Sequence, residues 1–138
     1  MIASSLFDSS TVPVLEQVIQ FTQKRHDILA GNIANLDTPG YRVRDLSQDQ
    51  FETRLKKAID QQDEQRTSYS LNSAATSHGN PINEVDDDFQ RMLYHDDSNV
   101  VLEEQVREIG KNQGRHNMAI AVMVSQFRLL QAAITERA

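Results

Sequence analysis

The feature that most constrains the fold is a seam of positions in the last third of the chain, spaced alternately four and three residues apart. An apolar period of about 3.5 residues, sustained over several heptads, is typical of a long helix packed along another helix in coiled-coil geometry. We therefore predict a helix from about Val100 to Thr135. The seam consists of Leu102, Val106, Ile109, Gln113, His116, Ile120, Met123, Phe127, Leu130 and Ile134.

The flanks of this segment agree with a helix. Ser98 or Asn99 can cap its start, because their side chains can accept a hydrogen bond from an otherwise unpaired backbone N–H group. Glu103 and Glu104 fall in the first turn, where the helix dipole favours negative charge. Glu103 and Arg107 have the i,i+4 spacing of a helical ion pair.

A second helix is predicted near the start of the chain, from about Pro13 to Asn35. After it, Pro39 and Gly40 occupy the second and third positions of a type II turn. We expect the helix to end at this turn and to pair with the C-terminal helix. Its expected apolar face, interrupted by Arg25 and His26, comprises Leu15, Val18, Ile19, Thr22, Leu29, Ile33 and Leu36.

The middle of the chain, residues 41–99, holds one clear local signal. The stretch Ser47–Gln50 has the spacing of a capping box, with Leu46 and Phe51 placed as a hydrophobic staple around a helix start. A short helix to about Gln61 is therefore predicted. We interpret Ser68–Leu71 as a weak extended segment and Ser77–Pro81 as a loop.

The predicted fold class is mainly α. Long N- and C-terminal helices pair in coiled-coil fashion, and a short middle helix and an irregular, partly extended loop region separate them. The expected organisation is an N-terminal helix with its turn in residues 1–40, a middle region in 41–99 and the heptad helix in 100–138, with the two ends forming one helical domain. With 138 residues, of which 38% are hydrophobic, the chain forms one small domain with a thin core.

Several classes of chemistry are excluded or disfavoured by composition and motifs. Because the chain has no cysteine, it forms no disulfide, thiolate zinc site or cysteine nucleophile. The four histidines share no metal-ligand spacing, Asp86–Asp88 lacks the pattern of a calcium loop, and no nucleotide-binding motif occurs. We predict no catalytic residue, no cofactor and no metal site, so that the protein is not an enzyme.

Nucleic acid and membrane are also disfavoured as partners. The net charge is −6 and no basic stripe exists to neutralise a phosphate backbone. The longest low-charge run, Met118–Phe127, is about half the length of a membrane span. The first residues lack the basic and apolar regions of a cleaved signal peptide.

Polar residues at expected contact positions have two interpretations. Gln113 and His116 lie at the centre of the seam, where they either fix the register of the helix pair or contact another subunit. Asn35 either supports the helix end while Asn32 is tolerated, or both amides form hydrogen bonds to the backbone of an adjacent helix or chain. The helix is apolar nearly all round at residues 119–124, which indicates cover from neighbouring subunits.

The stretch from Ala30 to Arg42, Ala-Gly-Asn-Ile-Ala-Asn-Leu-Asp-Thr-Pro-Gly-Tyr-Arg, resembles the N-terminal signature of bacterial flagellar axial proteins, the rod, hook and filament-related family. Asn99–Gln105, Asn112 with Gln113, and the run from Phe127 to Ile134 resemble the C-terminal helix of that family. The resemblance covers about the first 45 and the last 45 residues. Since hook and distal-rod members carry large inserted domains, this short chain is most similar to proximal-rod members.

The resemblance implies a structural subunit that is exported unfolded by the flagellar type III apparatus and assembles into the torque-transmitting rod in the periplasm. The implied partners are copies of the chain, other rod proteins, base-ring and rod-adaptor proteins and the export apparatus. A soluble helical adaptor or export-chaperone-like binding module remains the alternative. Besides the seam, the residues expected to carry assembly are those of the turn signature, Asn32, Ile33, Asn35, Pro39, Gly40 and Tyr41.

Overall fold

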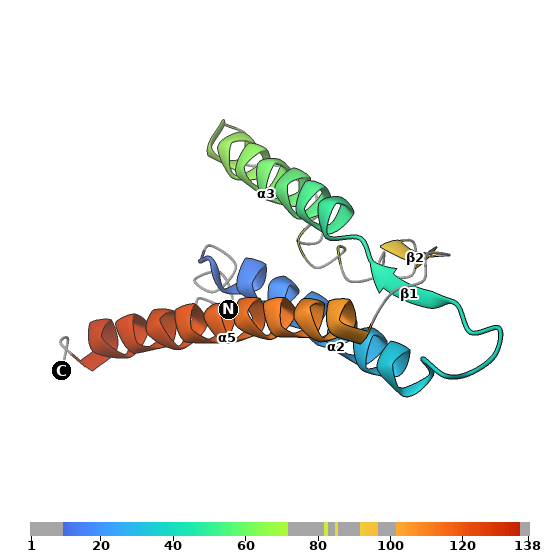
Figure 1. The fold of residues 1–138 in the computed structure, drawn as a ribbon. Coiled ribbons are helices and arrows are strands. Elements are labelled where there is room, and N and C mark those ends of the chain that lie inside the picture. Colours follow the sequence, from blue (N-terminus) through green and yellow to red (C-terminus); the bar gives the residue numbers. More distant parts are fainter. Residues whose placement is uncertain (1–9, 72–81, 83–84, 86–91, 97–101, 136–138) are drawn as a thin grey trace.

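The computed structural model of the protein describes residues 10–71, 82, 85, 92–96 and 102–135 (Figure 1). Two long helices from the two ends of the chain lie side by side, as the sequence predicts. The predicted cap at Ser98 or Asn99 and the predicted loop at Ser77–Pro81 lie outside the described residues. In chain order the elements are α2 (Val12–Ala34), β1 (Val43–Leu46), α3 (Gln48–Leu71), β2 (Leu93–Asp96) and α5 (Leu102–Thr135).

Helix α2 ends at the predicted turn. Asn35 caps the helix, and its side-chain Nδ2 donates a hydrogen bond to the backbone oxygen of Gly31 at 2.8 Å. Tyr41 N donates to Thr38 O at 3.1 Å, and Gly40 has a φ of 77°. Because a type II turn requires a positive φ at its third residue, glycine fits this position without strain. The turn sends the chain back toward α2 as strand β1.

Helix α3 begins at the predicted capping box. Gln50 N donates to Ser47 Oγ at 3.4 Å, and the staple residues Leu46 and Phe51 are both buried. The helix then continues to Leu71, well past the predicted end near Gln61. The extended segment predicted at 68–71 is therefore wrong. The residues after Gln61 lack an apolar face, but glutamine, glutamate and arginine favour helix by themselves.

The short antiparallel pair of β1 and β2 was not predicted from the sequence. Val43 lies opposite Asp96 and Leu46 opposite Leu93. Ser47 N extends the pairing by donating to Met92 O at 3.0 Å. Strands of four residues give almost no periodic signal, and these two lie far apart in the sequence. The pairing holds the segment around β2 against the start of α3.

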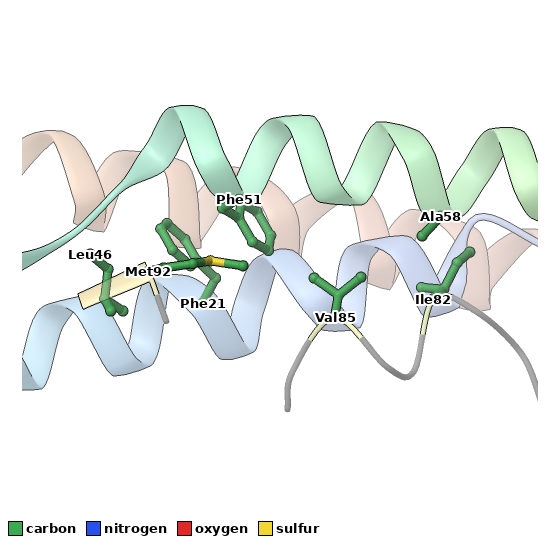
Figure 2. Packing of buried hydrophobic residues seen from close by; sticks show 7 residues of the cluster. All are labelled: Phe21, Leu46, Phe51, Ala58, Ile82, Val85 and Met92. Atoms are coloured by element: carbon green, nitrogen blue, oxygen red, sulfur yellow. The ribbon is translucent and has the colours of Figure 1, made fainter. Parts of the chain in front are cut away.

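The apolar core lies between α2, α3 and the segment that leads into β2 (Figure 2). The rings of Phe21 and Phe51 stack with centroids 4.0 Å apart and planes 9° apart. Aromatic rings in this arrangement contribute beyond the area that they bury. The core therefore joins α2 to α3 rather than to α5. Its buried members are Phe21, Leu46, Phe51, Ala58, Ile82, Val85 and Met92.

The buried face of α2 is rotated from the predicted one. Of the predicted stripe only Thr22 and Leu29 are buried, whereas Ile33 and Leu36 are half-buried. Arg25, interpreted as an interruption, is one of the most buried side chains of the helix. The helix is covered on two sides, by the apolar core and by α5, so one apolar stripe does not describe it. Its buried residues are Pro13, Gln17, Phe21, Thr22, Arg25, Leu29 and Asn32.

Candidate functional site

The contact between α2 and α5 is antiparallel and polar. The buried side chains of α5 are Gln105, Asn112 and Ala119, spaced seven residues apart. Each lies one residue before a member of the predicted seam. A shift of one residue turns the contact face by about 100° around the helix. The predicted heptad period is therefore correct, but six of the ten seam residues are assigned to the wrong face.

The members of the predicted seam divide into two sets. Ile109, His116, Met123 and Leu130 are half-buried and lie near the face that α5 turns toward α2. The rest are exposed, which contradicts their prediction as part of the contact with α2. Buried polar side chains replace them there, and they form hydrogen bonds across the contact with α2. The exposed set is Leu102, Val106, Gln113, Ile120, Phe127 and Ile134.

Asn32 is fully buried and ties three elements together. Its Nδ2 donates to Arg44 O at 2.6 Å and to Gln105 Oε1 at 3.1 Å. Its Oδ1 accepts hydrogen bonds from Arg44 N and Tyr41 OH, both at 3.1 Å. Asn32 therefore bonds to adjacent elements of this chain, but the backbone that it contacts is that of strand β1, and its bond to helix α5 goes to a side chain. Asn35 instead follows the simpler interpretation, a helix cap.

Arg25 forms a second junction of α2, β1 and α5. Its Nε and Nη2 donate to the two carboxylate oxygens of Asp45 at 2.8 and 2.6 Å. Nη2 also donates to Glu108 Oε2 at 3.0 Å, and Glu108 Oε1 accepts from Lys111 at 2.7 Å. Two parallel bonds from one guanidinium to one carboxylate fix the geometry as well as the charge. This cluster sets the position of α5 along α2.

The charges in the cluster shift the pKa of two members. Burial lowers the pKa of Arg25, but hydrogen bonds and charge from Asp45 and then Glu108 outweigh burial and raise it above its ordinary value. The hydrogen bond from Lys111 lowers the pKa of Glu108; burial opposes this, and the hydrogen bond and charge of Arg25 bring the net value below 4.5. The folded state therefore holds Glu108 ionised more strongly than the unfolded chain does.

The lowered pKa of Glu108 predicts acid sensitivity of the helix pair. Its contribution is present above the unfolded-state pKa of about 4.5 and is lost as the pH falls through the lower folded-state pKa. We expect Glu108→Gln to flatten the fall in unfolding free energy between about pH 6 and pH 3, measured by urea denaturation. Glu104→Gln, which removes a carboxylate whose side chain is 53% exposed, is the matched control. An equal flattening in both variants would contradict the role of Glu108.

Further polar contacts correct the predicted centre of the seam. Asn112 Nδ2 donates to Thr22 O at 2.7 Å, and His116 Nδ1 lies 2.9 Å from Thr22 Oγ1. Gln113 is exposed and donates to Asn117 of its own helix at 2.9 Å. The buried amide at the centre is thus Asn112 rather than Gln113. Near the helix start, Arg107 pairs with Glu104 at 3.1 Å, not with Glu103 as predicted.

The exposed face of α5 is the most apolar surface that the structure describes. Within the described residues, every large hydrophobic side chain that is exposed lies on this helix. Exposed apolar side chains gathered on one helix in this way are typical of an interaction surface. Five of these side chains belong to the predicted seam, and we name them the outer stripe: Leu102, Val106, Ile120, Phe127 and Ile134.

Helix α5 also has the length and composition of a membrane span. An 18-residue window within it reaches a mean hydropathy of 1.4 with at most two charged residues, and little of this window is buried. The low-charge stretch is thus longer than the Met118–Phe127 run considered above, since Arg128 is the one charged residue between Asn117 and Ile134. One such helix is weak evidence for a span, because helices that associate with other proteins have the same composition.

The described residues bring no three histidine, aspartate or glutamate side chains together in a way that could hold a metal ion. The ionisable cluster around Arg25 has its charges paired with one another rather than directed at an open cavity. Its chemistry is that of a structural junction.

Comparison with known proteins finds relatives among flagellar basal body rod proteins. A family described as "Flagella basal body rod protein" matches residues 20–42, which contain Arg25, Asn32 and the turn. The flagellar basal body rod protein FlgB of Salmonella typhimurium is 28% identical over 82% of this chain and 84% of its own length. The protein of the same name from Yersinia enterocolitica is 35% identical over 46% of this chain and 44% of its own length.

The chain is therefore similar to flagellar basal body rod proteins, over the turn signature and, at 28% identity, over 82% of its length. A third relative, FlgB of Aquifex aeolicus, is 54% identical over 25% of this chain and 28% of its own length. No solved structure matches the chain. The family model matches the turn signature itself, so the resemblance found there is confirmed.

The residues that the family model matches form one side of the polar contact between α2 and α5. The matched residues 20–42 supply Thr22, Arg25, Asn32 and Tyr41, while α5 supplies Gln105, Glu108 and Asn112. Pro39 and Gly40 form the exposed turn between helix α2 and strand β1. The sequence predicted Asn32 and Tyr41 but missed Arg25, Asp45, Gln105, Glu108 and Asn112. A charged residue interrupting an apolar face was the one available signal for Arg25.

Proposed function

We propose that this chain is a structural subunit of the flagellar proximal rod, and that its terminal helices assemble into the tube that transmits torque. The observation that carries the proposal is the outer stripe, which is apolar and exposed although the subunit is folded. Full burial of one exposed Val, Ile, Leu or Phe side chain contributes roughly 1.5–3 kcal/mol. The five side chains of the outer stripe are 40–73% exposed, so covering them together still favours association.

The arrangement of the two faces of α5 supports assembly. Its polar face is satisfied within the subunit by α2, which leaves the apolar face available to neighbours. The polar face of α5 thus serves the folding of the subunit, and its apolar face serves association with other subunits. Residues 1–40 and 100–138 then form the axial part, with residues 41–99 placed outward or between subunits.

Transmission of torque requires that force on α5 reach the rest of the subunit. The bonds of Arg25 to Asp45 and Glu108, and of Asn32 to Gln105 and Arg44, connect α5 to α2 and β1. Directional hydrogen bonds resist sliding of one helix along another better than apolar contacts, which are non-directional. We assign the turn signature, Asn32 to Tyr41, to this internal connection.

The proposed partners are copies of the chain, other rod proteins, base-ring and rod-adaptor proteins, and the flagellar export apparatus; the proposed location is the periplasmic rod. The outer stripe is proposed to be covered by protein rather than lipid. This proposal follows from the names of the relatives, which are flagellar basal body rod proteins.

The test is deletion of the chain's gene followed by electron microscopy of isolated basal bodies. We expect non-motile cells whose basal bodies lack a rod, with both defects restored by the intact chain. A tagged chain should co-purify with basal bodies. Basal bodies with a complete rod in the deletion strain would contradict the proposal, and recovery of the tagged chain only in a finite soluble complex would favour the adaptor alternative.

A further inference from the structure

A small polar pocket lies between α2 and α5, which run side by side (Figure 1). Its volume is about 170 Å³, and each helix contributes one histidine to it, His26 from α2 and His116 from α5. The other walls are hydroxyl and amide side chains, and no lysine, arginine or carboxylate is among the described residues that line it. Two imidazoles from different helices thus share one polar site, which is lined by Thr22, Gln23, His26, Asn112, Gln113 and His116.

The hydroxyl of Thr22 decides which ring nitrogen of His116 carries the proton. Thr22 Oγ1 lies 2.8 Å from Val18 O and 2.9 Å from Ile19 O, and both of these oxygens can only accept. The single proton of the hydroxyl is therefore used within α2, so His116 Nδ1, 2.9 Å from the same oxygen, is the donor. The Nε2 atom of the neutral ring then keeps its lone pair, which is the form that binds a metal ion. A hydrogen bond from the other ring nitrogen also orients the ring, as in most metal-bound histidines.

His26 has a ring nitrogen that lacks a partner. Its Nδ1 atom is buried and has no hydrogen bond within the part of the chain that the structure describes. A buried polar atom in this state requires an explanation, such as an ordered water molecule or a bound ion. Gln113 lines the same pocket, and its Nε2 donates to Asn117, so its amide oxygen is available as a further ligand. Neutral imidazoles suit zinc, copper and nickel ions rather than magnesium or calcium.

We propose that His26 and His116 together bind one divalent transition-metal ion of the zinc type between α2 and α5. Water molecules and an amide oxygen complete the four positions that zinc prefers. The ion links the two helices beside the junctions made by Arg25 and Asn32, and so strengthens the contact within the subunit. No local spacing could reveal this pair, because the two histidines lie on different helices. The inference does not depend on the proposed rod function.

Isothermal titration calorimetry with zinc chloride tests the inference on the purified full-length chain, untagged and freed of metal with a chelator. Because the chain has no cysteine, its histidines are its strongest ligands for zinc. We expect one zinc ion per chain. His26→Gln and His116→Gln should each weaken the affinity by at least about tenfold. His95→Gln, at an exposed position of β2 that does not line the pocket, is the matched control and should bind zinc as the unmodified chain does.

Urea denaturation supplies a second measurement that does not depend on the variants. Because the two histidines come together only in the folded chain, zinc should raise the urea midpoint of the unmodified chain. Circular dichroism checks that each variant is folded. Absence of zinc binding, unchanged affinity in either pocket variant, or one zinc ion per two chains would overturn the inference. None of these results bears on the rod proposal, which the deletion strain tests.

Discussion

Ile120→Asp is expected to abolish motility while leaving the isolated subunit folded. Ile120 is 40% exposed and lies at the centre of the outer stripe, one residue beyond the buried Ala119. An aspartate there remains solvated in the free subunit but is placed in an apolar contact on assembly, where an unpaired charge is costly. Swimming in soft agar measures the first expectation, and circular dichroism with urea denaturation of the purified chain measures the second.

Ser125→Asp is the matched control for Ile120→Asp. It introduces the same charge on the same helix, at an exposed position away from the outer stripe. We expect Ser125→Asp to retain more motility than Ile120→Asp at equal protein levels. Normal motility in Ile120→Asp would exclude the outer stripe as an assembly surface.

Arg25→Ala is expected to lower the free energy of unfolding by about 2–4 kcal/mol. The substitution leaves the carboxylates of Asp45 and Glu108, 15% and 22% exposed, without their shared cation. Removing one partner of a buried ion pair costs more than the pair contributes, because the remaining charge stays desolvated. Urea denaturation of the purified chain measures the loss.

Arg107→Ala is the control for Arg25→Ala. Arg107 also pairs with a glutamate, but its side chain is 61% exposed and that of Glu104 53%. Exposed pairs of this kind contribute little, so we expect a change below about 0.5 kcal/mol. Similar losses in the two variants would contradict the assignment of Arg25 as the junction of α2, β1 and α5.

Much of the fold could be predicted because local sequence signals mark where the helices begin and end. Pro13 near the start of α2, the type II turn at Pro39 and Gly40, and the capping box at Ser47 all act within a few residues of themselves. The strands β1 and β2 had no such signal. Each is four residues long, and their pairing joins segments that the whole of α3 separates. Long-range pairing of short strands is decided by packing rather than by pattern.

The heptad seam illustrates what hydrophobic periodicity reports. The pattern correctly marked one apolar face of α5, but α2 packs one residue away from it, against Gln105 and Asn112. The contact with α2 is made by amides and an ion pair, which a hydrophobic pattern does not reveal. The partners of Arg25 also lie 20 and 83 residues away in the sequence, beyond the reach of local signals. A stripe of apolar residues therefore indicates a surface that needs cover, without indicating whether the chain itself supplies it.

The outer stripe is exposed in the free subunit, and we propose that neighbouring subunits cover it in the rod. The most direct test uses the absence of native cysteine and measures the rate of maleimide labelling of Ile120→Cys, first in the purified chain and then in isolated basal bodies. We predict rapid labelling of the free subunit and strong protection in basal bodies. Equally rapid labelling in both would contradict the claim.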